Sequence, residues 1–176
     1  MNKRLLRKIC KEIRIKKSLN VRLSESRSIQ KNLFSEIDFS KYKNVFIYLS
    51  ALEKGEIDTW NIIPKLSSNN IYVPKMVNDE IKTAEYSERF SMNKFGILEC
   101  DNVVEVKIDL AVIPMLSFNK DLYRIGYGGG YYDKFLKDNN CLKIGLCADN
   151  MRDWVQDEYD ISLDMIVTPD RIYSRK

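Results

Sequence analysis

Residues 126–130 contain four of the seven glycines in this 176-residue chain. Glycine tolerates positive φ angles and lets a ligand approach the backbone, so a loop of this kind can turn its N–H groups toward an anion. Arg124, just upstream, carries a guanidinium that can grip phosphate oxygens in pairs. The run fits neither the dinucleotide fingerprint nor the Walker loop. It predicts a phosphate site of another kind, with a tight strand-to-helix turn as the structural alternative.

Carboxylates follow this loop. Asp133 falls in the first turn of an expected helix, where a negative charge interacts favourably with the helix dipole. Beside a polyphosphate, its carboxylate would also be a suitable ligand for Mg²⁺. Asp160 and Asp164 precede the last expected strand and could supply a second carboxylate. The alternative for both is a solvated loop acid.

Glu56 follows the first expected strand and Gly55, at the edge where open α/β sheets bind ligands. This position makes Glu56 a candidate binding residue. The alternative is helix capping by Asp58 or Thr59, with Glu56 exposed.

The positive charge is concentrated at the N-terminus. Residues 1–31 hold 11 basic and 2 acidic residues, whereas residues 32–176 hold 18 and 23. This excess predicts that the N-terminal segment meets an anion, with a solvated helix face as the alternative.

The chain contains no histidine, which excludes Ser-His-Asp and Cys-His catalysis, a His-ligated zinc and an imidazole general base. Cys10, Cys100, Cys141 and Cys147 form no Cys-x-x-Cys pair. We therefore expect reduced, mostly buried thiols.

Four segments are predicted to be helical. Leu5, Leu6, Ile9 and Ile13 recur at helical spacing between basic residues, and a second helix is expected after Ser24 as its N-cap. Residues 60–66, capped by Thr59, and residues 131–137 are the other two.

Short apolar runs predict buried strands of a mainly parallel sheet at residues 45–49, 71–73, 108–114, 142–146 and 165–167. Residues 78–105 are expected to form loops with one or two short strands. Strands alternating with helices predict an α/β fold: one three-layer α/β/α sandwich with a mixed sheet over residues 1–176, on which a helical segment at residues 1–40 packs.

Residues 1–4 run into a helical pattern without the apolar core of a signal peptide. The longest apolar stretches, 45–49 and 110–116, are far shorter than the roughly 20 residues that span a bilayer. We therefore expect a cytoplasmic protein without a membrane contact. We also expect a monomer.

Residues 124–133 resemble the signature R-[LI]-G-x-G-x-G-Y-Y-D of the 5-formyltetrahydrofolate cyclo-ligase family. Further segments resemble the family in the same order along the chain: the pair Lys3 and Arg7, and residues 56–59, 73–75, 95–99, 109–118 and 160–168.

The resemblance implies an ATP-dependent enzyme. ATP would phosphorylate the formyl oxygen of 5-formyltetrahydrofolate, N10 would attack the activated carbon, and phosphate would leave to give 5,10-methenyltetrahydrofolate and ADP. Such chemistry depends on positioning, Mg²⁺ and cationic groups, so it needs no histidine.

The resemblance also implies a role for each matching residue. The catalytic residues would be Arg124 and Tyr131, and the Mg²⁺ ligands Asp133 and Asp160. The folate substrate would contact Leu49, Glu56, Tyr127 and Tyr131. The ATP site would comprise Lys3, Arg4, Leu5, Leu6, Arg7, Arg124, Ile125, Gly126, Tyr127, Gly128, Gly129, Gly130, Tyr131 and Tyr132.

Two other functions stay open at this point. The basic N-terminal helix would suit a small nucleic-acid-binding protein, although no RNA-binding signature is present. A different phosphate-ligand enzyme on a similar scaffold, such as a sugar-phosphate isomerase, would also use the glycine loop.

Overall fold

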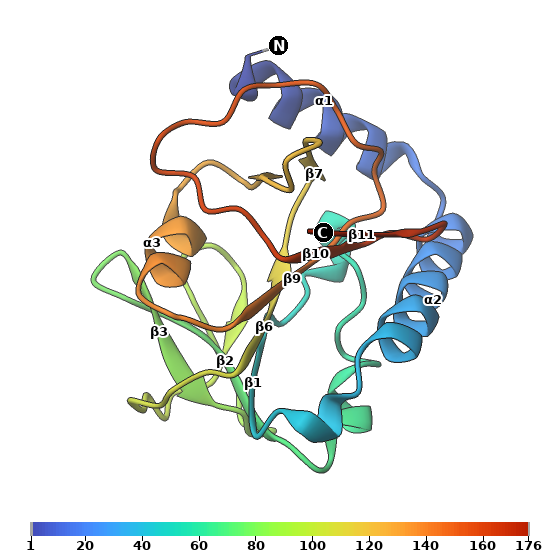
Figure 1. The fold of residues 1–176 in the computed structure, drawn as a ribbon. Helices are drawn as coiled ribbons and strands as arrows, with labels where there is room; N and C mark the ends of the chain where they lie inside the picture. Colours follow the sequence, from blue (N-terminus) through green and yellow to red (C-terminus); the bar gives the residue numbers. More distant parts are fainter. Residues whose placement is uncertain (1, 176) are drawn as a thin grey trace.

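A seven-stranded sheet crosses the centre of the molecule (Figure 1). In the computed structural model, which describes residues 2–175, its strand order is β11-β10-β9-β6-β1-β2-β3. The strands are β1 (Asn44–Ile47), β2 (Asn70–Val77), β3 (Glu80–Glu85), β6 (Leu110–Pro114), β9 (Leu142–Leu146), β10 (Met165–Val167) and β11 (Ile172–Ser174). The edge strands β3 and β11 are antiparallel to their neighbours, and the five inner strands are parallel. The predicted mainly parallel, mixed sheet is confirmed.

The two faces of the sheet are buried by different helices. Alternate residues of β1 point to opposite sides: Val45 and Ile47 pack in the cluster that includes Ile29 and Leu33 of α2 (Leu19–Glu36). Phe46 stacks on Phe135 of α3 (Tyr131–Lys137), with ring centroids 4.4 Å apart. Figure 1 shows α2 on one side of the sheet and α3 on the other. The three-layer α/β/α architecture is therefore confirmed.

Helix α1 (Lys3–Lys16) crosses the upper end of the sheet, beside the hairpin of β7 (Ser117–Phe118) and β8 (Arg124–Ile125) (Figure 1). The helix was predicted, but its apolar stripe was only partly right. Leu6 and Cys10 are buried, whereas Leu5 is 50% exposed. Arg14 is buried on the same face as Leu6 and Cys10, so polar contacts decide which face turns inward.

Two predicted helices differ from the structure, one in its start and one in its type. Helix α2 begins at Leu19 with Ser18 as its N-cap, whose side chain accepts a hydrogen bond from the N–H of Val21, so the helix does not begin after Ser24. Residues 60–66 form a turn followed by the short 3-10 helix η3 (Ile63–Leu66) instead of an α-helix. Pro64 lacks the N–H that an α-helix interior needs, and it disfavours the α conformation of the residue before it.

Residues 78–105 contain more strand than predicted. Strand β3 pairs with β2 around Asn78 and Asp79, which both have positive φ, so a two-residue turn joins Val77 to Glu80. The turn lacks the glycine that usually signals such a hairpin. Strands β4 (Ser91–Met92) and β5 (Leu98–Glu99) form a separate antiparallel pair. Among the described residues, no helix is long and apolar enough to cross a membrane.

Candidate active site

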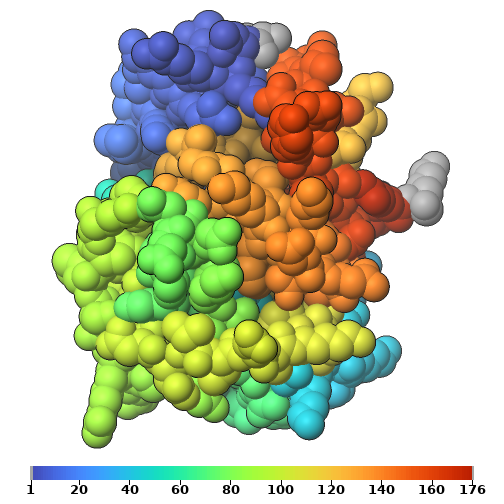
Figure 2. All heavy atoms as spheres, turned by 90° about the vertical axis from the view of Figure 1, so that its left-hand side faces the viewer, coloured from blue at the N-terminus to red at the C-terminus, as the bar shows by residue number. Residues whose placement is uncertain are grey.

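A cavity of about 900 Å³ opens at the carboxyl ends of β1 and β6. These neighbouring strands mark a reversal in strand order, because β2 lies on one side of the pair and β9 on the other. Open α/β sheets bind ligands at such a point. On the face shown in Figure 2, the glycine loop and α3 (orange) lie between α1 (blue) and the segment of β2 to β5 (green). The cavity lining includes Lys3, Arg7, Glu56, Glu99, Arg124 and Asp133.

The glycine loop presents its backbone to this cavity. No N–H group of residues 126–130 donates a hydrogen bond to another described residue. Gly128 and Gly130 have φ angles of 111° and 68°, at which a residue with a side chain would be strained. At Gly129 a Cβ atom would collide with the ring of Tyr131, so a larger residue there would have to displace that ring. The loop thus offers free N–H donors of the kind that bind anions.

Arg124 adds a buried cation beside the loop. Its side chain is almost fully buried, and its NH2 nitrogen lies 3.0 Å from Oδ2 of Asp133. Its Nε has no hydrogen-bond partner among the described residues. The guanidinium also lies over the ring of Tyr132, with 5.6 Å between guanidinium carbon and ring centroid. A buried donor without a partner is costly, so Nε of Arg124 is available to a group that enters the cavity.

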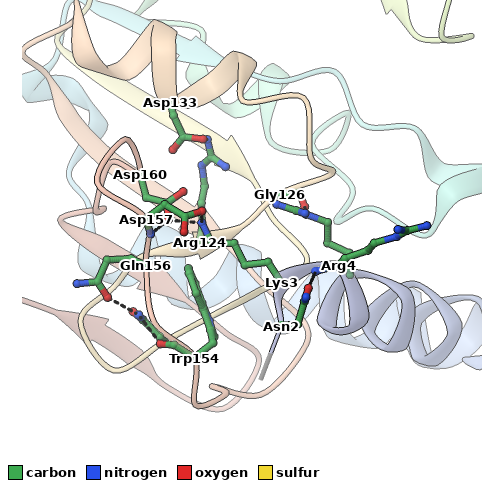
Figure 3. A network of polar contacts seen from close by, with 12 residues as sticks. Asn2, Lys3, Arg4, Arg124, Gly126, Asp133, Trp154, Gln156, Asp157 and Asp160 are labelled. Atoms are coloured by element: carbon green, nitrogen blue, oxygen red, sulfur yellow. Dashed lines mark hydrogen bonds and ion pairs between the residues drawn. The ribbon is translucent and has the colours of Figure 1, made fainter.

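The two predicted metal carboxylates lie in one polar network (Figure 3). Asp133 Oδ1 accepts a hydrogen bond from the N–H of Ile161 at 3.2 Å, which brings α3 against the segment that carries Asp160. Asp160 forms an ion pair with Lys3 and accepts a hydrogen bond from the N–H of Asp157 at 2.7 Å. Lys3 Nζ also lies 2.7 Å from Asp157 Oδ2.

This donor set fits Mg²⁺ bound together with a phosphate. Residues 2–175 contain no cluster of three or more metal-binding side chains that could hold an ion alone. Mg²⁺ usually takes one or two carboxylates and completes its shell with phosphate oxygens and water, so Asp133 and Asp160 suffice. Each carboxylate is paired with a cation, Arg124 or Lys3, that would itself attract the phosphates.

Only part of the predicted N-terminal ATP segment reaches the cavity. Lys3 and Arg7 line it, and Arg7 Nε donates a hydrogen bond to the carbonyl oxygen of Gly126 at 3.1 Å. Arg4 and Leu5 are exposed outside it. Leu6 and Ile125 pack instead in a small apolar cluster with Cys10, Leu116 and Trp154. Side-chain contacts to ATP by Leu5, Leu6 and Ile125 therefore find no support, because these side chains point away from the cavity.

The predicted folate residues Leu49 and Glu56 also line the cavity. Glu56 Oε2 accepts a hydrogen bond from the N–H of Ala51 at 2.8 Å, and Oε1 accepts one from the Tyr127 hydroxyl at 2.7 Å. Burial raises the pKa of Glu56 above its ordinary value. A partly buried carboxylate whose two oxygens each accept one hydrogen bond can still bind a ring that carries several N–H donors.

The tyrosines of the glycine motif also line the cavity. The ring of Tyr131 lies on Gly129 and faces Phe95, with ring centroids 6.2 Å apart. Burial raises the pKa of Tyr127 and of Tyr132, so both hydroxyls stay protonated at neutral pH. These three side chains can thus act as hydrogen-bond donors or as stacking surfaces.

Two side chains at the site were not predicted. Glu99 is 3% exposed, lies 3.2 Å from Lys75 Nζ and accepts hydrogen bonds from the N–H of Met76 and from Asn93. Arg14 lies behind Glu56 and bonds to Tyr127. Arg14 follows Arg7 by seven residues, two helical turns, and this spacing was the available signal.

A glycine loop with free N–H groups, a buried arginine and several carboxylates in one cavity of an α/β fold are features of an enzyme that binds a small anionic ligand. The chain belongs to the 5-formyltetrahydrofolate cyclo-ligase family, whose model matches residues 1–169.

Individual relatives agree with this assignment. The chain is 27% identical to a probable 5-formyltetrahydrofolate cyclo-ligase of Schizosaccharomyces pombe, covering 85% of this chain and 86% of the relative. A 5,10-methenyltetrahydrofolate synthetase of Aquifex aeolicus has a similar structure, with a TM-score of 0.87 and 30% identity over 99% of this chain and 93% of that one. The synthetase of Mycoplasma pneumoniae follows with a TM-score of 0.76 and 26% identity, covering 96% of this chain and 99% of that one.

Proposed function

We propose that this protein converts 5-formyltetrahydrofolate to 5,10-methenyltetrahydrofolate, with ATP as cosubstrate and release of ADP and phosphate. One observation supports the proposal: a single cavity is lined both by a glycine loop with free N–H groups beside the buried Arg124 and by a partly buried carboxylate, Glu56. A volume of about 900 Å³ lies in the upper part of the roughly 300–1,000 Å³ range of ligand cavities, which suits two substrates bound together.

In the proposed reaction, the formyl oxygen attacks the γ-phosphorus of ATP, and the bond to ADP breaks. N10 then attacks the activated formyl carbon and loses its proton, and the carbon–oxygen bond breaks to release phosphate. The product carries a new N10–carbon bond and a positive charge shared between the two nitrogens.

The chain's own residues position and stabilise these steps. Arg124 and the N–H groups of residues 126–130 would hold the transferring phosphoryl group, because preorganised donors act where negative charge develops. Lys3 and Arg7 would hold the other ATP phosphates, and Tyr131 would lie at the formyl end. Mg²⁺ held by Asp133 and Asp160 would neutralise phosphate charge. Glu56 and Leu49 would bind the pterin ring. A cytoplasmic location and a monomeric state remain predictions.

The test is an absorbance assay. The purified protein is mixed with 5-formyltetrahydrofolate, Mg²⁺ and ATP, and formation of the methenyl product is followed in the near ultraviolet. We expect product only when ATP is present, and ADP in equal amount. Folded protein that forms no product with ATP would overturn the proposal, and product formed equally well without ATP would favour a different enzyme on this scaffold.

A further inference from the structure

Arg14 is the only basic residue of α1 that is buried; the whole of Lys3–Lys16 is described. The other basic residues of this helix keep their charged ends in water or at the cavity. A buried guanidinium is expensive unless its donors are used, so its partners indicate why it is there.

The partners of Arg14 lie on two different elements of the site. NH2 donates a hydrogen bond to the carbonyl oxygen of Met115 at 2.6 Å, directly after β6. NH1 donates to the hydroxyl of Tyr127, in the glycine loop, at 3.0 Å. The aliphatic stem packs on the backbone of Gly55, where a Cβ atom would lie 2.7 Å from Cγ of Arg14. The guanidinium is thus fixed to the end of the central sheet and to the glycine loop, and its stem packs on the segment that carries Glu56.

Tyr127 connects Arg14 to Glu56. Its hydroxyl accepts the hydrogen bond from Arg14 and donates its own hydrogen to Glu56 Oε1 at 2.7 Å. Arg14 therefore reaches Glu56 through one hydroxyl group. We call Arg14, Tyr127 and Glu56 the Arg14 relay.

The relay contributes to the charge balance around Glu56. Burial raises the pKa of this carboxyl. The hydrogen bonds from Tyr127 and from the N–H of Ala51 oppose that effect, as do the charges of Arg14 and Lys54. The titratable groups facing Glu56 come from four parts of the chain. They are Arg14 in α1, Tyr48 after β1, Lys54 in the short helix η2 (Leu52–Lys54), and Tyr127 and Tyr132 around the glycine loop. Among them Arg14 is the buried cation.

We propose that Arg14 is a positioning residue: through Tyr127 it holds Glu56 ionised and oriented for the pterin ring and ties this carboxylate to the loop that binds ATP. The inference rests on the proposed function of the cavity. It differs from a purely structural role, in which Arg14 would only anchor α1 through Met115, because it requires the Tyr127 hydroxyl.

A double-mutant cycle separates the two roles. Arg14→Met keeps the length of the buried stem, and we expect it to raise the KM for 5-formyltetrahydrofolate about tenfold, with a smaller change in the KM for ATP. In the Tyr127→Phe background the same substitution should change the KM much less, because the relay is already broken. Lys16→Met, which removes an exposed charge from the same helix, is the matched control and should leave both constants unchanged. Equal effects of Arg14→Met in the two backgrounds would overturn the proposal.

A second measurement is independent of turnover. The pKa of the Glu56 carboxyl is followed by carbon NMR, with the signal assigned through Glu56→Gln. We expect this pKa to rise by about one unit in Arg14→Met and to stay near the wild-type value in Arg14→Lys, which keeps the charge. Should Arg14→Met fail to fold, Tyr127→Phe tests the same link and should also raise the pKa. An unchanged pKa in the folded variants would contradict the relay, whereas a changed pKa in a protein without cyclo-ligase activity would contradict only the proposed function.

Discussion

The guanidinium of Arg124 lies 3.0 Å from the carboxylate of Asp133, and both side chains line the cavity. The residue proposed to hold the transferring phosphoryl group is thus paired with a residue proposed to hold Mg²⁺. Asp160 and Lys3 form a second pair of the same kind. Binding of magnesium and ATP would exchange partners in both pairs, each cation moving to phosphate and each carboxylate to the metal.

Replacing Arg124 with methionine should lower kcat by about a hundredfold or more, since removing one preorganised donor from a developing anion typically has this effect. Asp133 would lose its partner but is partly exposed, so the protein should still fold. The measurement is steady-state kinetics with circular dichroism as the folding check. Arg89→Met, which removes an exposed arginine outside the cavity lining, is the control. A kcat for Arg124→Met within twofold of the wild type would contradict the assigned role.

Replacing Lys3 with methionine should raise the dissociation constant for ATP about tenfold, because one charge-assisted contact to phosphate is lost. The folded protein also loses the ion pairs of Lys3 with Asp157 and Asp160. We therefore expect faster hydrogen exchange in residues 157–161 of the variant. Lys8→Met, at an exposed position of the same helix, should change neither quantity. If Lys3→Met bound ATP as tightly as the wild type, the N-terminal charge would be a solvated helix face.

The strands were predictable because a strand that is buried on both faces of a sheet appears in the sequence as a continuous apolar run. In β1, Val45 and Phe46 are both fully buried but face different helices, so the run is apolar throughout. The glycine loop before α3 was predictable because four glycines in five positions are typical of a turn that needs positive φ angles, which Gly128 and Gly130 adopt.

Features that depend on distant partners were missed. The buried face of α1 was only partly predicted because Arg14 is held inside by hydrogen bonds to Met115 and Tyr127. The spacing of apolar residues along a helix does not reveal such polar contacts. The start of α2 was misplaced because Ser18 and Ser24 are equally good caps locally, and packing of Ile29 and Leu33 does not distinguish them. Glu99 was left without a role because its partner Lys75 lies on another strand.

Replacing Asp133 or Asp160 with asparagine should weaken Mg²⁺ binding to the ADP complex about tenfold or more, since each variant removes one of two carboxylates from the proposed site. ADP binding without metal should not weaken, because each substitution also frees a cation. Calorimetric titration of Mg²⁺ into the ADP complex measures the effect. Asp153→Asn, exposed and outside the cavity lining, is the matched control. Unchanged metal affinity in both variants would place the ion elsewhere.

The buried thiols predict a loss of stability at alkaline pH. Burial raises the pKa of Cys10 from 9.0 to about 11 and that of Cys147 to about 12. In the unfolded chain both thiols lose their protons from about pH 9, whereas in the folded protein they stay protonated up to their raised pKa. Between these two pH values, deprotonation stabilises the unfolded state relative to the folded state. The free energy of unfolding should fall by up to about 1.4 kcal/mol per pH unit for each thiol. This window runs from pH 9 to about 11 for Cys10, and to about 12 for Cys147.

Urea unfolding between pH 8 and 11 tests this effect. We expect a Cys10→Ala, Cys147→Ala variant to be less stable at pH 8, because it loses buried volume, but to show a shallower alkaline decline. A decline as steep as that of the wild type would show that other groups control it.

The fate of the formyl oxygen tests the proposed reaction most directly. When 5-formyltetrahydrofolate carries a heavy-oxygen label in its formyl group, phosphorylation of that oxygen must deliver the label to inorganic phosphate. Mass spectrometry of the phosphate after a full turnover with Mg²⁺ and unlabelled ATP measures this transfer. We predict one labelled oxygen in each phosphate released. Methenyl product accompanied by unlabelled phosphate, with the label in water, would contradict the mechanism.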